Sequence, residues 1–183
     1  MSPMGAIVIT DSYSHMFGEE ILRQKHDALY KEILHILVTT PVSRTKISEE
    51  KGRYGELIFS GPDFNEPLKQ ALHQKGWRAR RVVYPGQTEY SFEVDFCKGR
   101  VGLEIQFGKY FAVQKDLYNL LYLFGLDEER RIDVGIIVIP SDQLHAKMPS
   151  GVGKFGSIIT AIRSHPRNDP PCPAVILGID VAE

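Results

Sequence analysis

The chain has 183 residues, of which 43% are hydrophobic and 25% charged, and 22 Lys and Arg against 23 Asp and Glu give a formal net charge of -1. These proportions are typical of a globular protein and exclude a disordered chain, a collagen or a coiled coil. The length suits one substantial core, so we expect a single domain over residues 1–183. A near-neutral charge neither requires nor excludes nucleic acid as a partner, because binding depends on where basic residues cluster.

The compartment follows from three features of the sequence. The longest apolar runs, at residues 136–139 and 174–177, fall far short of the roughly 20 residues of a membrane helix. The N-terminus lacks the pattern of a secretory signal. Cys97 and Cys172 are too few for a disulfide framework and fit unpaired thiols. We therefore expect a cytoplasmic protein without a membrane partner.

The first part of the chain predicts helices. Residues 18–37 carry apolar side chains at the three- and four-residue spacing of an amphipathic helix. The charged segment at residues 43–53 predicts a loop or a short solvated helix. Residues 62–77 predict a short helix that ends at Gly76.

From Arg78 onward the apolar period changes to two. Residues 78–84, 90–96 and 101–107, with turn residues at Pro85-Gly86 and Lys98-Gly99, predict an antiparallel meander. Later elements are a helix at residues 113–124, a helix ending at Arg163, and buried strands at residues 132–139 and 174–179. This order predicts the α/β class, with a central mixed β-sheet flanked by helices.

The second and third strands of the meander bring acidic residues together. A two-residue turn at Lys98-Gly99 would pair Phe96 with Val101 and Asp95 with Gly102. Strand alternation then predicts one polar face and one core face. The polar face comprises Asp95, Gly102, Glu104 and Gln106, and the core face comprises Val94, Leu103 and Ile105. Asp95 and Glu104 become diagonal neighbours roughly 7–8 Å apart.

Two carboxylates at this spacing can share a hard cation such as Mg²⁺, with water and substrate phosphate as further ligands. Gly102 would leave room for the ion. The ion would lower the pKa of a bound water and neutralise charge on a phosphate, while Gln106 could orient the water. The pattern thus suits phosphodiester hydrolysis. The alternative is an exposed sheet face on which these side chains simply meet solvent.

The order Asp95, eight residues, Glu104, one residue, Gln106, followed by Phe107-Gly108-Lys109-Tyr110, resembles the active-site hairpin of the BglII and BstYI group of Type II restriction endonucleases. These enzymes belong to the PD-(D/E)XK nuclease superfamily, most of which has Lys in place of Gln106. The similarity covers nearly the whole chain and is closest to BstYI. Other matching residues are Tyr13-Ser14-His15, Gly18, Arg44-Thr45-Lys46, Lys51, Gly55, Asn65, Lys75-Gly76-Trp77, Ile132-Asp133-Val134-Gly135, Met148, Ser150-Gly151 and residues 175–179.

The resemblance implies a PD-(D/E)XK restriction endonuclease-like fold and a homodimer that cuts both strands of a palindrome containing GATC. The implied site is RGATCY or a relative, the cofactor is Mg²⁺ with Mn²⁺ as a substitute, and the product has a four-base 5′ overhang. Asp95 and Glu104 would bind the metal, with Gln106 near the nucleophilic water. A companion methyltransferase would modify the same site.

The DNA-binding residues are expected in three places. By resemblance, Lys109 faces a guanine edge, which suits its donors, and Ser150 and Gly151 belong to a loop that reads bases. Arg44 and Lys46 lie in the basic polar loop and could contact phosphates. The alternative for both basic residues is an ordinary charged surface.

Two other functions remain open at this point: a DNA-binding protein that keeps the fold without cutting, and a repair nuclease selective for branched or damaged DNA. The intact set of Asp95, Glu104 and Gln106 argues against a silent binder. Four residues of the helix at 113–124 predict a core stripe, namely Leu117, Leu120, Leu121 and Phe124. Tyr118 and Tyr122 on the same helix offer a dimer surface, which a palindromic target favours.

Overall fold

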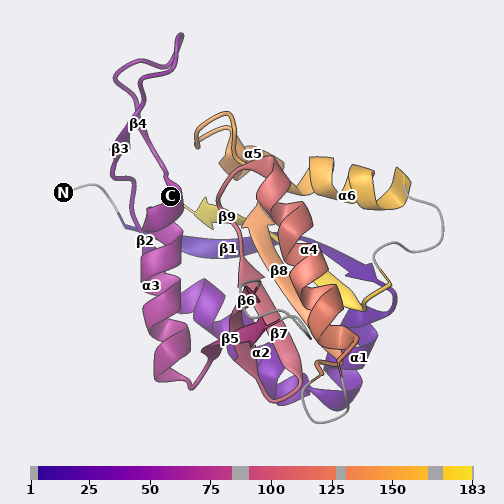
Figure 1. Ribbon diagram of the computed structural model, residues 1–183. Coiled ribbons are helices and arrows are strands. Elements are labelled where there is room, and N and C mark those ends of the chain that lie inside the picture. The colour runs from indigo at the N-terminus through magenta and orange to yellow at the C-terminus, as the bar shows by residue number, and fades with distance from the viewer. Residues whose placement is uncertain (1–3, 84–90, 127–130, 165–170, 183) are drawn as a thin grey trace.

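The centre of the protein is a seven-stranded mixed sheet in the order β2-β1-β9-β8-β7-β6-β5 (Figure 1). The computed structural model describes residues 4–83, 91–126, 131–164 and 171–182. The sheet comprises β1 (Gly5–His15), β2 (Pro41–Val42), β5 (Arg78–Val83), β6 (Ser91–Lys98), β7 (Val101–Ile105), β8 (Val134–Pro140) and β9 (Ala174–Ala182). Strands β7, β8 and β9 run parallel to one another, and the other pairings are antiparallel. The predicted α/β class is confirmed.

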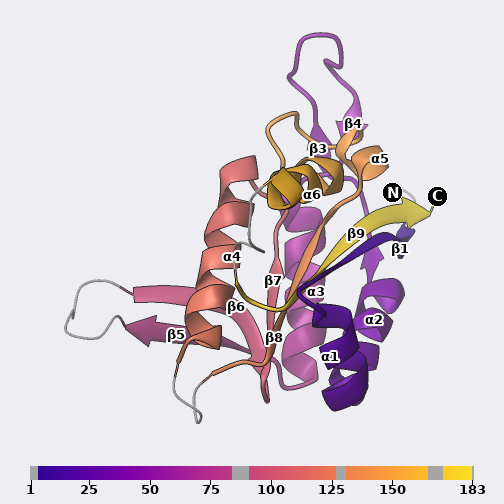
Figure 2. The same ribbon diagram turned by 90° about the vertical axis from the view of Figure 1, so that its right-hand side faces the viewer.

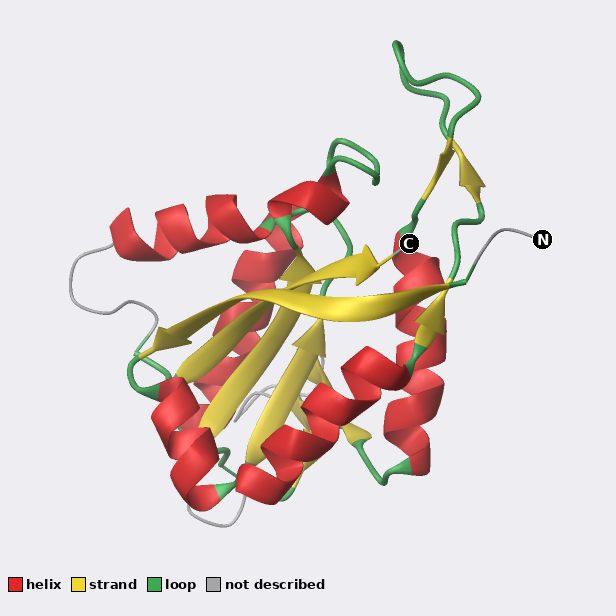
Figure 3. Cartoon of the chain, turned by 180° about the vertical axis from the view of Figure 1, so that it is seen from behind, coloured by secondary structure: helices red, strands yellow, loops and turns green. Residues whose placement is uncertain are grey.

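Helices cover both faces of the sheet (Figures 2 and 3). They are α1 (Gly18–Lys25), α2 (Asp27–Thr39), α3 (Gly61–Gln74), α4 (Tyr110–Phe124), α5 (Asp142–His145) and α6 (Phe155–Ser164). Successive residues of β8 enter opposite layers: Ile136 packs with α1, α2 and α3, whereas Ile137 packs with α4 and α6. Every residue of β8 is buried. This confirms the prediction of a strand covered on both faces.

Several predicted elements are present with shifted ends. The meander of β5, β6 and β7 is antiparallel, as expected, while its predicted turn at Pro85-Gly86 lies outside the described residues. Strand β1 was not predicted, because its side chains do not alternate between buried and exposed.

Cys97 and Cys172 are buried free thiols. Among the described residues, no helix has the length and apolar character needed to cross a bilayer.

The predicted helix over residues 18–37 is two helices that meet at His26. The backbone of His26 leaves the helical region, with φ -133° and ψ 29°. Its ring nitrogen Nε2 lies 3.0 Å from Oδ2 of Asp133, and Arg100 Nε donates to the other oxygen of Asp133 at 2.9 Å. This ion cluster ties the helix break to the loop before β8.

Asp133 gives the fold a pH dependence. Partial burial opposes ionisation, but hydrogen bonds from Arg100 and His26 prevail and lower the pKa of Asp133. A depressed carboxyl pKa stabilises the fold above the unfolded value of about 3.9, and that contribution is lost as pH falls through the folded value. We expect Asp133→Asn to lower the free energy of unfolding by about 1 kcal/mol at pH 7. Urea unfolding should show the difference shrinking below about pH 4; an equal difference at pH 7 and pH 3 would contradict this role.

An arm projects from the body before α3. The segment predicted as a loop or short helix lies here, and it forms a two-stranded ladder of β3 (Lys46–Ile47) and β4 (Leu57–Ile58) with a long connecting loop (Figures 1 and 3). Lys46 pairs with Ile58, and Ile47 with Leu57. The loop expectation is therefore correct for the tip and wrong for the base of the arm.

Candidate active site

The hairpin of β6 and β7 turns one residue later than predicted. Its ladder pairs Phe96 with Leu103 and Lys98 with Val101, so the turn is Gly99-Arg100. Gly99 has φ 57°, the positive value that a two-residue hairpin turn requires at its first position. The predicted pairing of Phe96 with Val101 is wrong. The partner moves by two residues, which keeps the alternation along β7.

The two predicted carboxylates meet where the described ladder of this hairpin ends, after Phe96 and Leu103. The backbone N–H of Asp95 donates to Oε2 of Glu104 at 3.1 Å. In the other direction, the backbone N–H of Ile105 donates to Oδ2 of Asp95 at 3.2 Å. These side-chain bonds bridge the two strands and fix both carboxylates in place. Asp95 and Glu104 are thus brought together, as predicted.

A β-bulge in β6 explains a second departure from the sequence prediction. Opposite β5, Cys97 pairs with Arg78 and Val94 with Arg80, so Asp95 and Phe96 together face one residue. A bulge of this kind redirects side chains. Phe96 packs in the layer of α3, whereas Val94 packs in the layer of α4. The expectation that Val94 shares a core face with Leu103 and Ile105 is wrong.

Gly102 does not make room for an ion. A Cβ at this position would lie 2.8 Å from Cδ2 of Leu120 and 3.0 Å from Cδ1 of Ile132. The space is therefore filled by the apolar side chains that hold α4 against the sheet. The predicted role of Gly102 is therefore wrong. The absence of a side chain at this position instead lets Leu120 approach β7.

Glu104 is a buried carboxyl, and only one of its two oxygens accepts a hydrogen bond within the described part of the chain. The residue is 1% exposed, and its Oε1 has no hydrogen-bond partner among the described residues. Burial, followed by the charges of Asp95 and Asp116, raises the pKa of Glu104. An ionised carboxylate in such a place needs a positive partner.

A third carboxyl, Asp116 of α4, joins the site through Gln106. The amide of Gln106 donates from Nε2 to Oδ2 of Asp116 at 2.5 Å, and its Oε1 accepts from the backbone N–H of Gly108 at 2.7 Å. Burial raises the pKa of Asp116 to about 6, against the opposing effect of the Gln106 hydrogen bond. A side chain at position 108 would collide with Gln106, since a Cβ there lies 2.6 Å from Oε1. Asp116 was not predicted as a site residue, although this carboxyl interrupts the apolar stripe of the helix.

These residues fit a hard cation. Glu104 offers an oxygen without a hydrogen-bond partner among the described residues, and Asp95 lies beside it. Burial, together with neighbouring carboxylate charge, raises the pKa of Glu104 and of Asp116, and a bound cation would offset both effects. Across the described ranges, no group of three or more His, Cys, Asp or Glu residues is placed to hold a metal ion by itself. Two carboxylates completed by water and substrate phosphate are a common Mg²⁺ arrangement.

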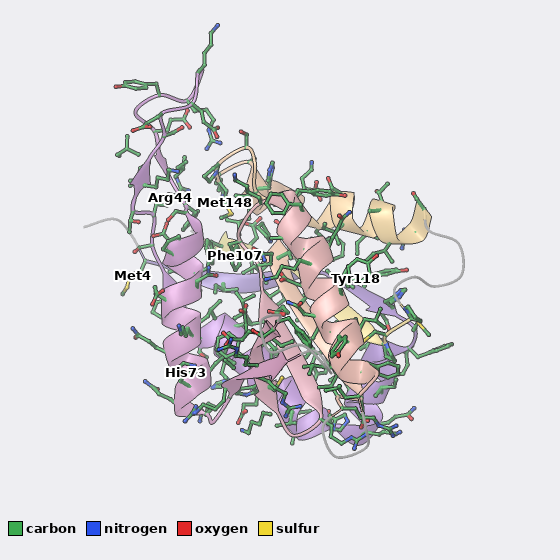
Figure 4. The ribbon with its side chains drawn as sticks, viewed as in Figure 1. Met4, Arg44, His73, Phe107, Tyr118 and Met148 are labelled. Atoms are coloured by element: carbon green, nitrogen blue, oxygen red, sulfur yellow. The ribbon has the colours of Figure 1, made fainter. Side chains whose placement is uncertain are left out.

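A hollow of about 360 Å³ opens beside Asp95, between α3 and strands β5, β6 and β7. Its lining residues are Asn65, Glu66, Lys69, His73, Ala79, Glu93, Asp95, Phe96 and Ile105. Oδ1 of Asn65 is buried without a hydrogen-bond partner in the described part of the chain. Figure 4 places His73 towards the lower end of α3. No role was predicted for these α3 residues. The sequence did contain a signal, namely a polar side chain at every fourth position, at Asn65, Lys69 and His73.

The structure joins the predicted base-reading residues. Lys109 forms an isolated β-bridge with Val152, and the N–H of Tyr110 donates to the carbonyl of Gly151 at 3.3 Å. Lys109, Ser150 and Gly151 are all exposed. They form one surface, at the N-terminus of α4 and directly after the Gln106–Gly108 contact.

The arm packs against the same surface. Oε1 of Glu50 accepts from the backbone N–H of Ser150 at 2.8 Å, and Arg53 donates to the carbonyl of Met148 at 3.0 Å. Arg44, at the base of the arm (Figure 4), lies 5.1 Å from the ring centre of Phe59, and Lys46 is exposed. Residues predicted separately to contact DNA are therefore linked through Glu50 and Ser150.

Helix α4 buries its predicted stripe and exposes an aromatic outer face. Leu117 and Leu120 are buried, and Leu121 and Phe124 pack against the same cluster. Tyr118 is 61% exposed (Figure 4), whereas Tyr122 packs edge-on against Phe92 with ring centres 4.7 Å apart. The core stripe is confirmed.

Solved structures define the class of protein. The crystal structure of restriction endonuclease BglII complexed with a DNA 16-mer has a TM-score of 0.75 and 24% identity, covering 94% of this chain and 77% of that one. The crystal structure of free BglII has a TM-score of 0.59 and 20% identity, covering 94% and 78%. The fold is thus that of a restriction endonuclease.

The family follows from the sequence comparisons. The model of the family described as restriction endonuclease BglII/BglIII matches residues 10–179. The Type II restriction enzyme BglII of Bacillus subtilis is 30% identical over 136 residues, which are 72% of this chain and 57% of that protein. The chain belongs to the BglII/BglIII restriction endonuclease family, and it spans less than two thirds of the length of this relative.

Proposed function

We propose that the protein is a Type II restriction endonuclease that hydrolyses both strands of a palindromic duplex containing GATC, with RGATCY or a relative as its site. The observation that carries this proposal is the pair of adjacent carboxylates, Asp95 and Glu104, with a buried oxygen on Glu104 that has no hydrogen-bond partner in the described part of the chain. Family membership and the adjoining exposed loops support it. The chain would form a single domain over residues 1–183 and act in the cytoplasm. It would belong to the PD-(D/E)XK nuclease superfamily, with BstYI as its nearest counterpart.

Asp95 and Glu104 are the residues proposed to hold Mg²⁺, for which Mn²⁺ would substitute. When bound, the ion would lower the pKa of a water and neutralise charge on the phosphate. Gln106 would lie near that water, and its bonds to Asp116 and Gly108 fix the position of its amide. The hydrogen bonds from the backbone N–H of Asp95 to Glu104 and from the backbone N–H of Ile105 to Asp95 keep the carboxylates from rotating away.

The DNA would lie across the surface formed by Lys109, Ser150, Gly151 and the arm. The donors of Lys109 suit the two acceptors of a guanine edge in the major groove. Ser150 and Gly151 would read bases from the adjoining loop, while Arg44 and Lys46 would contact phosphates, which position a protein without reading sequence. The bond between Glu50 and Ser150 holds the arm and this loop together.

Two copies are proposed to act together. The two strands of a palindrome carry the same sequence, so each copy of a two-fold dimer can cut one strand. The outer face of α4 supports this, since Phe111 and Tyr118 are 66% and 61% exposed. Such a homodimer would leave four-base 5′ GATC overhangs. A cognate methyltransferase would protect the same site in the host.

Replacement of Lys109 with Ala is expected to weaken binding of the cognate duplex by about 1–3 kcal/mol and to reduce discrimination against a duplex with the guanine changed. Both affinities can be measured in Ca²⁺ by fluorescence anisotropy. Lys31→Ala is the matched control, since this lysine pairs with Asp27 on α2 and its side chain is 71% exposed. Unchanged discrimination in Lys109→Ala would refute the guanine contact.

The function itself is tested with short duplexes. Purified protein and Mg²⁺ should cut an unmethylated duplex with a central AGATCT and leave a duplex with a scrambled centre intact. Specific binding without cutting in Mg²⁺ or Mn²⁺ would favour the silent DNA-binding protein. Cutting confined to branched or damaged duplexes would favour the repair nuclease.

A further inference from the structure

One wall of the hollow beside Asp95 is a polar face of α3. Asn65, Lys69 and His73 follow one another at intervals of four residues, which places them on the same side of the helix. All three line the hollow, and Asp95 lies on its other wall. The volume of about 360 Å³ compares with roughly 30 Å³ for one water in the liquid. A phosphodiester group therefore has room to enter.

The hollow is acidic, which creates a problem for a phosphate. Glu66, Glu93 and Asp95 line it, and the buried Glu104 accepts a hydrogen bond from the backbone of Asp95. A DNA phosphate that approaches Asp95 adds another negative charge. The carboxylates that line the hollow would repel it. A cationic side chain in the same hollow would remove this repulsion.

Lys69 is placed to supply that cation. In the described part of the chain it forms no ion pair or hydrogen bond, whereas Lys98 pairs with Glu32 and Lys154 with Asp142. The ring of His73, the other basic group in the lining, packs edge-on against Phe96 with ring centres 5.7 Å apart. A lysine ammonium carries three donors on a flexible stem, which suits a phosphate.

Gln106 cannot take this part. Its side chain is neutral, and its amide is engaged by Asp116 and by the backbone of Gly108. Among the described residues that line the hollow, the basic ones are Lys69 and His73, so a positive charge beside the substrate would come from α3 or from the metal. Successive turns of a helix rise by about 5.4 Å, so Lys69 lies one step along the wall from Asn65.

We propose that Lys69 binds a backbone phosphate of the cut strand, the one next to the phosphate that faces Asp95 and Glu104. The inference rests on the proposed function, because it assumes that DNA enters the site to be cut. Lys69 would contact the strand only in the bound complex. It would hold the strand in place for the reaction without contributing to base recognition.

The test is single-turnover cleavage of a cognate duplex by the full-length protein at saturating concentration. Lys69→Ala is expected to slow cleavage roughly 30- to 300-fold, as the loss of a well-placed charged donor does. Lys69→Arg keeps the charge and should stay within about fivefold of the wild type. Lys31→Ala is again the control and should leave the rate unchanged. In Ca²⁺, loss of one phosphate contact should reduce the salt dependence of log K by about 0.9.

A substrate series locates the contact. Phosphates on either side of the cut are replaced one at a time by a neutral methylphosphonate. One replacement should slow the wild type and have little further effect on Lys69→Ala. A wild-type rate in Lys69→Ala, equal losses in Lys69→Ala and Lys69→Arg, or full additivity at every position would overturn the inference. If the wild type cuts no duplex, the proposed function fails and the inference falls with it.

Discussion

Replacement of Asp95 with Ala, or of Glu104 with Gln, is expected to abolish Mg²⁺-dependent cleavage, with a loss of at least about 10³-fold in rate. Each change removes a carboxylate charge from the proposed metal site. Neither residue belongs to the surface proposed to read bases, so binding of the cognate duplex in Ca²⁺ should stay within about threefold of the wild type. Cleavage gels and anisotropy on the same preparations give both quantities.

Glu104→Gln should also raise the free energy of unfolding, although it abolishes cleavage. Burial and the neighbouring carboxyls raise the pKa of Glu104, so its ionisation opposes folding increasingly as pH rises. The neutral variant escapes this cost and should unfold at higher urea concentration than the wild type at pH 8. Asp27→Asn on α2, whose side chain is 43% exposed, is the control for both measurements. Retained cutting by Asp95→Ala or Glu104→Gln would refute the site assignment.

Trp77→Ala is expected to have the largest effect on folding. Trp77 is completely buried, and its Nε1 donates to Oε1 of Glu32 at 2.8 Å. The same oxygen accepts from Nζ of Lys98 at 2.7 Å. The truncation opens a large cavity and removes the donor that links α2 to the loop before β5. We expect a loss of about 3–5 kcal/mol in the free energy of unfolding, out of a typical total of 5–15 kcal/mol.

Trp77→Phe separates the two contributions. Phenylalanine fills most of the cavity but cannot donate to Glu32, which keeps its bond to Lys98. A cost of about 1–2 kcal/mol is therefore expected. Urea titrations monitored by circular dichroism measure both variants. A loss below about 1 kcal/mol for Trp77→Ala would mean that the site collapses around the missing ring.

The sheet could be predicted where burial produces a clear pattern. Strand β8 is a continuous apolar run because helices cover both of its faces. Strand β1 escaped prediction because only its first two residues pair with β2, and its polar side chains follow no simple alternation. The periodicity of a segment indicates which faces of a strand are buried. It gives little information on a strand such as β1, which is paired along only part of one edge.

The candidate site was predictable in its residues but not in its geometry. The spacing of Asp95, Glu104 and Gln106 identified the hairpin, yet the bulge depends on the pairing of β6 with β5, which the spacing does not encode. The conformational preference of Gly99 was the signal for the correct turn. Asp116 was visible as a carboxyl at a core-facing position. The bond between Glu50 and Ser150 joins segments 100 residues apart, and no local pattern predicts such a contact.

The most direct test of the account is to sequence the fragment ends produced from unmethylated phage DNA by the wild type and by Asp95→Ala in Mg²⁺. The wild type should give ends at one palindrome, all with four-base 5′ GATC overhangs, and Asp95→Ala should give none. Random ends from the wild type, or the same specific ends from Asp95→Ala, would contradict a sequence-specific endonuclease that cuts at the Asp95–Glu104 pair.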